Sequence, residues 1–214
     1  MYNTKKIEIL LDTFPLYSED LGIDLKEPSG RFKWFLASIL FGARISEKIA
    51  ANTYKRFEAH GLDSPEKIIA AGWNELVSVL DEGGYVRYDF STATKLLGIM
   101  EALQETYRSL EDLYAEAKDT KDLQRRLQEF KGVGLVTTQI FLRELRGVWH
   151  VSPEVSTRAQ SAAKNLDIPL HELEGETLAR VETALVKLSI RYCTKKRCEE
   201  CPVKDFCRQV VLED

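Results

Sequence analysis

Cysteine is missing from the first 192 residues of the chain, and no long apolar run occurs in any part of it. The most apolar stretch, residues 34–41, is far shorter than the roughly 20 residues that a membrane-spanning helix needs. The first residues, MYNTKK, contain no apolar core of the kind found in a secretion signal. We therefore expect a cytoplasmic protein with no membrane partner.

An excess of positive charge is also missing. The chain has 30 lysine and arginine residues against 34 aspartate and glutamate residues, which gives a formal net charge of −4 at pH 7. This balance argues against a general binder of polyanions, so any role with nucleic acid would depend on local basic patches. The 214 residues suffice for one large domain or two small ones, and since nothing indicates an obligate dimer, we expect a monomer.

Alternating patterns typical of strands are scarce, and apolar residues recur at helical spacing instead. The densest apolar stripe lies between residues 32 and 40 and is typical of a buried helix. Residues 63–66, DSPE, combine a cap residue, a proline and an acid, and so predict a helix start. Clear breaks occur at residues 28–30 and 83–84. The sequence therefore predicts an all-α fold with short connections.

The cysteines that the chain does have form one pattern, C-x4-C-x2-C-x5-C, made by Cys193, Cys198, Cys201 and Cys207. The spacing is too tight for two independent disulfides and suits four thiolates around one inorganic centre. A [4Fe–4S] cluster uses four such ligands, often with a proline after one of them, and Pro202 follows Cys201 here. A zinc site would use two C-x2-C pairs, of which the chain has one. Free reduced thiols are normally buried, whereas these stand among charged residues.

A second motif occupies residues 127–138, LQEFKGVGLVTT, where one predicted helix ends, two glycines flank a valine, and another helix begins. Glycines permit a tight turn and let the backbone approach a ligand closely. The unpaired N–H groups at the start of the second helix favour a phosphate or a coordinated cation. Such a helix–hairpin–helix can hold a DNA backbone without reading its sequence, although many helical hairpins carry a similar turn for packing alone.

With both motifs in this order, the chain resembles the endonuclease III branch of the helix–hairpin–helix DNA glycosylases over essentially its whole length. The resemblance implies a six-helix barrel domain, residues 28–148, with the hairpin motif near residues 120–146. It also implies a discontinuous helical domain, residues 1–27 and 149–214, that holds a [4Fe–4S] cluster on the four cysteines. The first cysteine gap is x4, where the family usually has x6. DNA would be the partner, and the protein would be associated with the nucleoid.

The resemblance further implies DNA contacts at the hairpin turn and in the loop between the first two cysteines, namely at Lys131, Gly132, Val133, Gly134, Lys195, Lys196 and Arg197. Arg44 falls where a family side chain fills the space left by an extruded base. Tyr85 falls where another side chain wedges into the duplex. Each of these has a structural alternative, because a charge run is often ordinary solvated surface and an aromatic after two glycines often covers a core edge.

The chemistry departs from the family. Its lyase members form a Schiff base through a lysine two residues beyond the second hairpin glycine, and Val136 stands at that position. Ser152 stands where the family has its aspartate, in the stretch HVSPEV. Arg158 resembles a family arginine but is offset by one residue, so the register is open by one or two positions. Glu154 could then supply the carboxylate, with His150 nearby, or could simply favour the dipole of the following helix.

Two hypotheses follow. The favoured one is a DNA-binding protein that recognises damaged, distorted or branched DNA and lacks the standard chemistry, because a positioned acid or base contributes about 10²–10⁴-fold and two are missing. The alternative is a monofunctional glycosylase that uses a carboxylate such as Glu154. In either case we expect the cluster to order a charged C-terminal segment that burial alone would not fold.

Overall fold

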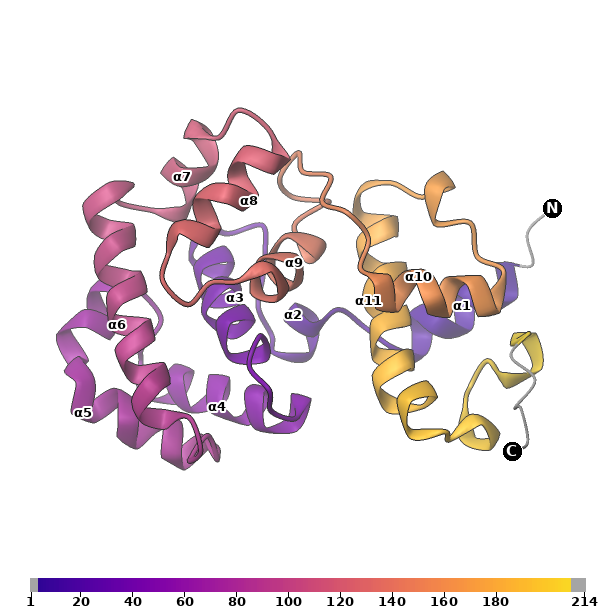
Figure 1. The fold of residues 1–214 in the computed structure, drawn as a ribbon, viewed down its shortest axis with the longest axis horizontal. Helices are drawn as coiled ribbons and strands as arrows, with labels where there is room; N and C mark the ends of the chain where they lie inside the picture. The colour runs from indigo at the N-terminus through magenta and orange to yellow at the C-terminus, as the bar shows by residue number, and fades with distance from the viewer. Residues whose placement is uncertain (1–3, 209–214) are drawn as a thin grey trace. The chain divides into compact units, whose positions relative to one another are not determined.

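The computed structural model describes residues 4–208, in which the regular secondary structure is helical and no strand occurs (Figure 1), so the predicted all-α fold is confirmed. The chain divides into two compact units. Unit 1 comprises the described residues up to Asp20 and from Leu142 onward, and unit 2 comprises Leu21–Phe141. No helix within residues 4–208 combines the length and the apolar character needed to cross a membrane.

Unit 2 is built from six helices and the first part of a seventh, which continues into unit 1. They are α3 (Pro28–Phe41), α4 (Glu47–Ala59), α5 (Pro65–Gly83), α6 (Asp89–Thr106), α7 (Leu110–Glu116), α8 (Thr120–Glu129) and α9 (Leu135–Glu144). In this unit α4 packs against both α3 and α5, and α5 packs along α6. The predicted helix start is confirmed at Pro65, where the hydroxyl of Ser64 accepts the Lys67 N–H at 3.4 Å.

The centre of unit 2 is α3, which is buried on nearly all sides because its apolar residues surround the helix. The ring of Phe35 packs against Phe141 with a centroid distance of 5.1 Å. The Trp34 indole Nε1 donates to the Phe141 carbonyl at 3.0 Å, which satisfies its one polar atom. The predicted buried stripe between residues 32 and 40 is therefore confirmed.

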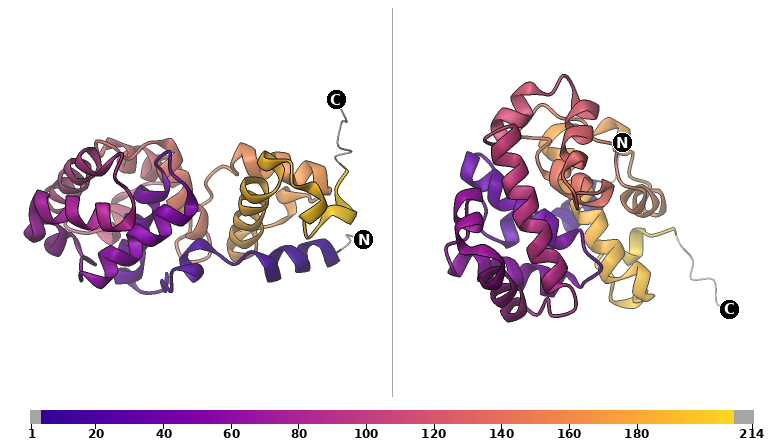
Figure 2. Two further views of the ribbon diagram at one scale, coloured as in Figure 1. Left: turned by 90° about the horizontal axis from the view of Figure 1, so that it is seen from below. Right: turned by 60° about the vertical axis from the view of Figure 1, so that its left-hand side comes forward.

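Unit 1 brings together segments from the two ends of the chain. Its helices are α1 (Thr4–Thr13), α2 (Tyr17–Asp20), α10 (Thr157–Leu166) and α11 (Gly175–Arg191), with the 3₁₀ turns η1 (Leu170–Glu172), η2 (Cys193–Lys195), η3 (Cys198–Glu200) and η4 (Lys204–Phe206). Both α1 and α10 pack against α11 (Figures 1 and 2). The Lys6 ammonium of α1 donates to the carbonyl of Asp167 at 2.8 Å and to that of Leu166, so a cation closes the C-terminal end of α10.

An ion pair is buried inside unit 1. Nη2 of Arg146 lies 2.7 Å from Oε2 of Glu182, and these side chains are 3% and 2% exposed. Nη1 of Arg146 also donates to the Pro153 carbonyl at 2.6 Å, and Oε1 of Glu182 accepts the Ser156 N–H at 2.9 Å. The pair therefore fixes the backbone of residues 153–156 against α11.

The joints between the units differ from the boundaries predicted from the sequence, which were 27/28 and 148/149. In the structure they lie a few residues earlier, at 20/21 and 141/142. Residues 24–26 belong to unit 2 because Nη1 of Arg31 donates to the carbonyls of Leu25 and Lys26, at 2.9 and 2.7 Å. The end of α9 belongs to unit 1 because the Glu144 carboxylate accepts the N–H groups of residues 17 and 18, each at 2.9 Å.

Replacing Glu182 with glutamine should destabilise the protein by about 3–5 kcal/mol, because the buried Arg146 charge would lose its counter-ion. The matched control on the same helix is Glu176→Gln. The Glu176 carboxylate is 68% exposed and lies 3.0 Å from Nε of Arg180, so its loss should cost only about 0.3–0.5 kcal/mol. Denaturant unfolding of both variants measures the difference, and equal losses would contradict a special role for the buried pair.

Candidate functional site

In the hairpin between α8 and α9, two apolar side chains are buried and the rest of the turn is exposed to solvent. Phe130 and Val133 are buried, 4% and 3% exposed, and the Val133 N–H donates to the Phe130 carbonyl at 2.9 Å. Lys131, Gly132 and Gly134 are exposed. Gly132 has φ of 109°, a conformation that side-chain-bearing residues rarely adopt. The turn thus presents a cation and bare backbone to solvent.

Two other parts of unit 2 lie directly against this hairpin region, and in both places a glycine permits the close approach. A Cβ on Gly42 would lie 2.2 Å from Oγ1 of Thr137, in the first turn of α9. A Cβ on Gly132 would lie 2.3 Å from Cγ of Lys95, in α6. The bend after α3 and the middle of α6 therefore flank the hairpin region. Arg44 is exposed in that bend and makes no ion pair within residues 4–208.

Tyr85 does not occupy the position predicted for a wedging side chain. It is 1% exposed, and its hydroxyl donates to the Leu40 carbonyl at 3.0 Å. Burial raises the pKa of Tyr85 above its usual range. The prediction that Tyr85 inserts into DNA is therefore wrong, because the turn after Gly84 directs this ring into the core and leaves Val86, 65% exposed, at the surface.

The resemblance places a catalytic lysine at position 136, and the surroundings of this position are apolar in the structure as well as in the sequence. Val136 is 59% exposed in the first turn of α9, and its neighbour Leu135 is 56% exposed. Exposed aliphatic side chains at a helix start neither bind a proton nor attack a carbon atom. The part of the hairpin that could meet a nucleic acid therefore offers contact area there and no nucleophile.

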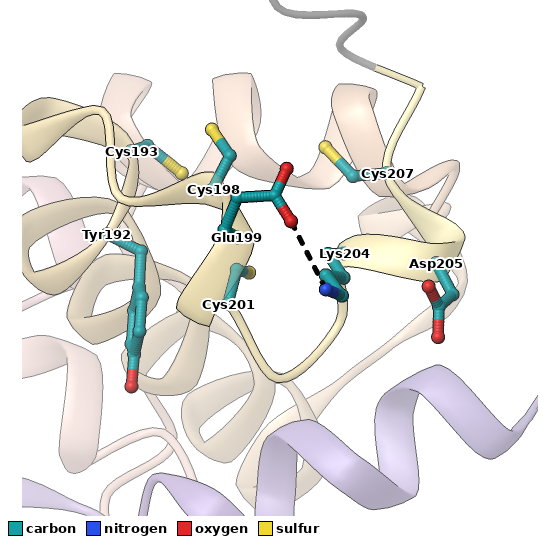
Figure 3. A pocket seen from close by; sticks show the side chains of 8 residues that line it. All are labelled: Tyr192, Cys193, Cys198, Glu199, Cys201, Lys204, Asp205 and Cys207. Carbon is teal, nitrogen blue, oxygen red and sulfur yellow. Dashed lines mark hydrogen bonds and ion pairs between the residues drawn. The ribbon is translucent and has the colours of Figure 1, made fainter.

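The four cysteines line one cavity of about 380 Å³ in unit 1, and none forms a disulfide (Figure 3). Cys193 lies in η2 and Cys198 in η3, whereas Cys201 and Cys207 directly follow η3 and η4, and each of the four is partly buried. Tyr192, Glu199, Lys204 and Asp205 complete the lining. Burial, together with the neighbouring thiol groups, raises the pKa of the Cys193 thiol above its usual range.

This donor set fits a centre with four thiolate ligands. Zinc would require all four sulfurs at about 2.3 Å from one ion. Within residues 4–208, no three cysteine, histidine or carboxylate side chains are grouped tightly enough to hold a single metal ion. The four thiols line one cavity and match the number of ligands that a [4Fe–4S] cluster takes.

The basic loop between the first two cysteines keeps only part of its charge free. Arg197 is bound to Glu200, with Nε 3.1 Å from Oε1, and its guanidinium stands 6.0 Å from the centre of the Tyr192 ring. Lys195 and Lys196 are exposed and make no ion pair within the described residues. Two lysines rather than three cations are therefore available to an external anion.

The proposed carboxylate position lies on a second cavity of unit 1, with a volume of about 770 Å³. His150, Ser152 and Glu154 all line it, and all three are exposed. Val151 and Pro153 between them also line the cavity but are buried, so the exposed side chains of this segment at the cavity are those of residues 150, 152 and 154. Ser152 and Glu154 line the same cavity, so the position expected for the family aspartate lies at this cavity whichever of the two residues aligns with it.

Sequence reasoning missed two features of unit 2. Lys95 belongs to no motif, and only the fold brings it to the hairpin. Trp73 and Phe90, 39% and 59% exposed, pack in a tilted arrangement at a centroid distance of 5.3 Å although they come from different helices. No spacing in the sequence links Lys95 to the hairpin or Trp73 to Phe90, so no sequence pattern could have indicated these contacts.

Comparison with known proteins found no matching family model and no matching curated protein. Among solved structures, the chain is similar to the crystal structure of H. pylori 3-methyladenine DNA glycosylase (MagIII) bound to 1,N6-ethenoadenine. The two chains are 14% identical, with a TM-score of 0.52, and the match covers 89% of this chain and 98% of the other. This chain has a DNA glycosylase fold. Because the match covers 89% of this chain, it includes parts of both units.

Proposed function

We propose that this protein binds DNA and recognises damaged, distorted or branched structures through the hairpin of unit 2. The hairpin turn carries the proposal, because Phe130 and Val133 anchor it while Lys131 stays exposed without an ion pair in the described residues. A rigid turn with bare backbone and a free cation suits a phosphate and reads no base sequence. The glycosylase fold supports the same partner.

The proposed function does not include cleavage of the DNA backbone through a Schiff base. Schiff-base formation requires an amine, and Val136 offers an aliphatic side chain at that position. Ser152 carries no charge with which to stabilise an oxocarbenium-like transition state. The apolar pair Leu135 and Val136 would instead contribute contact area beside the phosphate-binding turn.

The protein should bind duplex and junction DNA with an affinity that falls linearly on a log–log plot against salt, and more tightly when the DNA is mismatched, abasic or branched. Lys131→Gln should reduce the salt slope by about one, because one phosphate contact is lost. Lys121→Gln, about 12 Å along α8 from the end that leads into the turn, removes the same charge and should leave the slope unchanged. Fluorescence anisotropy measures both, and no binding at low salt would refute the proposal.

The second cavity of unit 1 favours a second candidate function, monofunctional base excision. Glu154 and His150 line that space together, and a carboxylate could act there as a general base. Single-turnover incubation with duplexes carrying uracil, oxidised pyrimidines, 8-oxoguanine or alkylated bases, followed by hot alkali, would detect base loss. If this function is correct, Glu154→Gln should reduce release by about 10²–10⁴-fold. Glu174→Gln lines the same cavity and is the control; a blank panel would exclude this candidate.

We also propose that the cysteine cavity holds a [4Fe–4S] cluster through Cys193, Cys198, Cys201 and Cys207. When bound, it would supply the folding free energy that orders three short 3₁₀ turns. The residues around it anchor those turns: Tyr192 packs on Phe14 with a centroid distance of 6.3 Å, and Val203 is fully buried in the core of unit 1.

Anaerobically purified protein should therefore be brown, with broad visible absorption and about four iron atoms per chain. Cys201→Ser should lose the colour and lower the thermal midpoint, because the turns lose their ligand. Asp205→Asn alters the lining of the same cavity without removing a thiolate and should keep the colour. A colourless protein with one zinc ion per chain would contradict this assignment.

A further inference from the structure

Lys95 of α6 covers the hairpin turn with its side chain. Its Cγ, Cδ and Cε would lie 2.3, 2.4 and 2.8 Å from a Cβ on Gly132, so the aliphatic stem runs over the glycine. The ammonium is one bond beyond Cε and therefore also lies at the turn. Within residues 4–208 this ammonium has no hydrogen bond and no ion pair. A partly buried stem thus holds a free cation beside the turn.

The arginines of α8, which leads into the same turn, are neutralised internally. Asp122 pairs with Arg125 at 2.6 Å and with Arg126 at 2.9 Å. Arg125 also binds Glu129, and Arg126 also lies 3.2 Å from Glu116. Hydrogen bonds from these two arginines lower the pKa of Asp122 below its usual range, so that carboxylate stays charged. Lys121 lies near the other end of α8, so Lys95 and Lys131 are the cations at the turn itself that have no ion pair within residues 4–208.

We propose that Lys95 is a second phosphate-binding residue of the hairpin, acting beside Lys131 on the DNA backbone. This inference rests on the proposed DNA-binding function and extends the binding site from the hairpin motif to α6. Gly132 has two roles in it. Its φ allows the turn, and its missing side chain gives the Lys95 stem room to lie flat. Packing of the stem restricts its rotamers before DNA arrives, which lowers the entropic cost of the contact.

The test compares Lys95→Met, which keeps an apolar stem over Gly132, with Lys95→Arg, which keeps the charge. The control is Lys67→Met in α5, whose ammonium is already paired with Asp63 at 2.6 Å. Lys67 lies away from the Lys95 position. Its neighbour Glu66 accepts a hydrogen bond from Gln104, which is about 13 Å further along α6 than Lys95. Both methionine variants lose one positive charge, so a general charge effect would appear in both.

Anisotropy titrations of the full-length protein with duplex DNA should show the salt slope reduced by about one in Lys95→Met. Binding at low salt should weaken several-fold and equally for all sequences. Lys95→Arg should bind like the wild type, and Lys67→Met should keep the wild-type slope. Thermal midpoints of the wild type and the three variants show whether weaker binding comes from a lost phosphate contact or from a loss of folded protein.

Two results would overturn the inference, and they are distinguishable. If the wild type binds DNA but Lys95→Met has the wild-type slope and affinity, Lys95 only covers the glycine and the DNA-binding function stands. If the wild type does not bind DNA at all, the DNA-binding function fails and the inference fails with it.

Discussion

The buried pair of Arg146 and Glu182 is the interaction on which unit 1 depends. Charges removed from water need a partner and further hydrogen bonds, and here each side chain also binds backbone of residues 153–156. This fixes which residues of that segment face the core. Val151 and Pro153 are buried in the wall of the cavity, whereas Ser152 and Glu154 are exposed in it. The buried ion pair therefore helps to set the geometry of the proposed excision site.

In unit 2 the positions of neighbouring elements are fixed in another way, by glycines that let two elements approach closely. Gly42, Gly83 and Gly132 each stand where a Cβ would lie 2.2 or 2.3 Å from an atom of another element. At Gly83 the nearest atoms include Cα of Thr53, which cannot move aside without moving α4. Close packing at these glycines fixes the turn after α5 against α4 and brings the bend after α3 and the middle of α6 against the hairpin region. The proposed DNA surface is therefore set by backbone packing as well as by its cations.

Much of the fold was predictable because its causes are local. Helical periodicity, the cap at Ser64 and the G-V-G turn each depend on residues close in sequence, and each is found as expected. Tyr85 was mispredicted because its direction depends on space beside Leu40, which no local pattern encodes. The joints between the units were displaced for the same reason, since Arg31 and Glu144 decide them through distant backbone groups. The cysteine pattern predicted a common site, and its four members do line one cavity.

The distribution of charge reconciles an acidic protein with the proposed polyanionic partner. A guanidinium matches a carboxylate with two parallel hydrogen bonds, so arginines near carboxylates tend to be neutralised within the protein, as Arg126 and Arg197 are. Lysine is a compact, strongly hydrated charge that binds phosphate without fixed geometry. Lys95, Lys131, Lys195 and Lys196 remain free of ion pairs in the described residues. In unit 2, Lys95 and Lys131 at the hairpin and Arg44 in the neighbouring bend would bind a phosphate backbone by position and not by base identity. This favours recognition of DNA shape over recognition of DNA sequence.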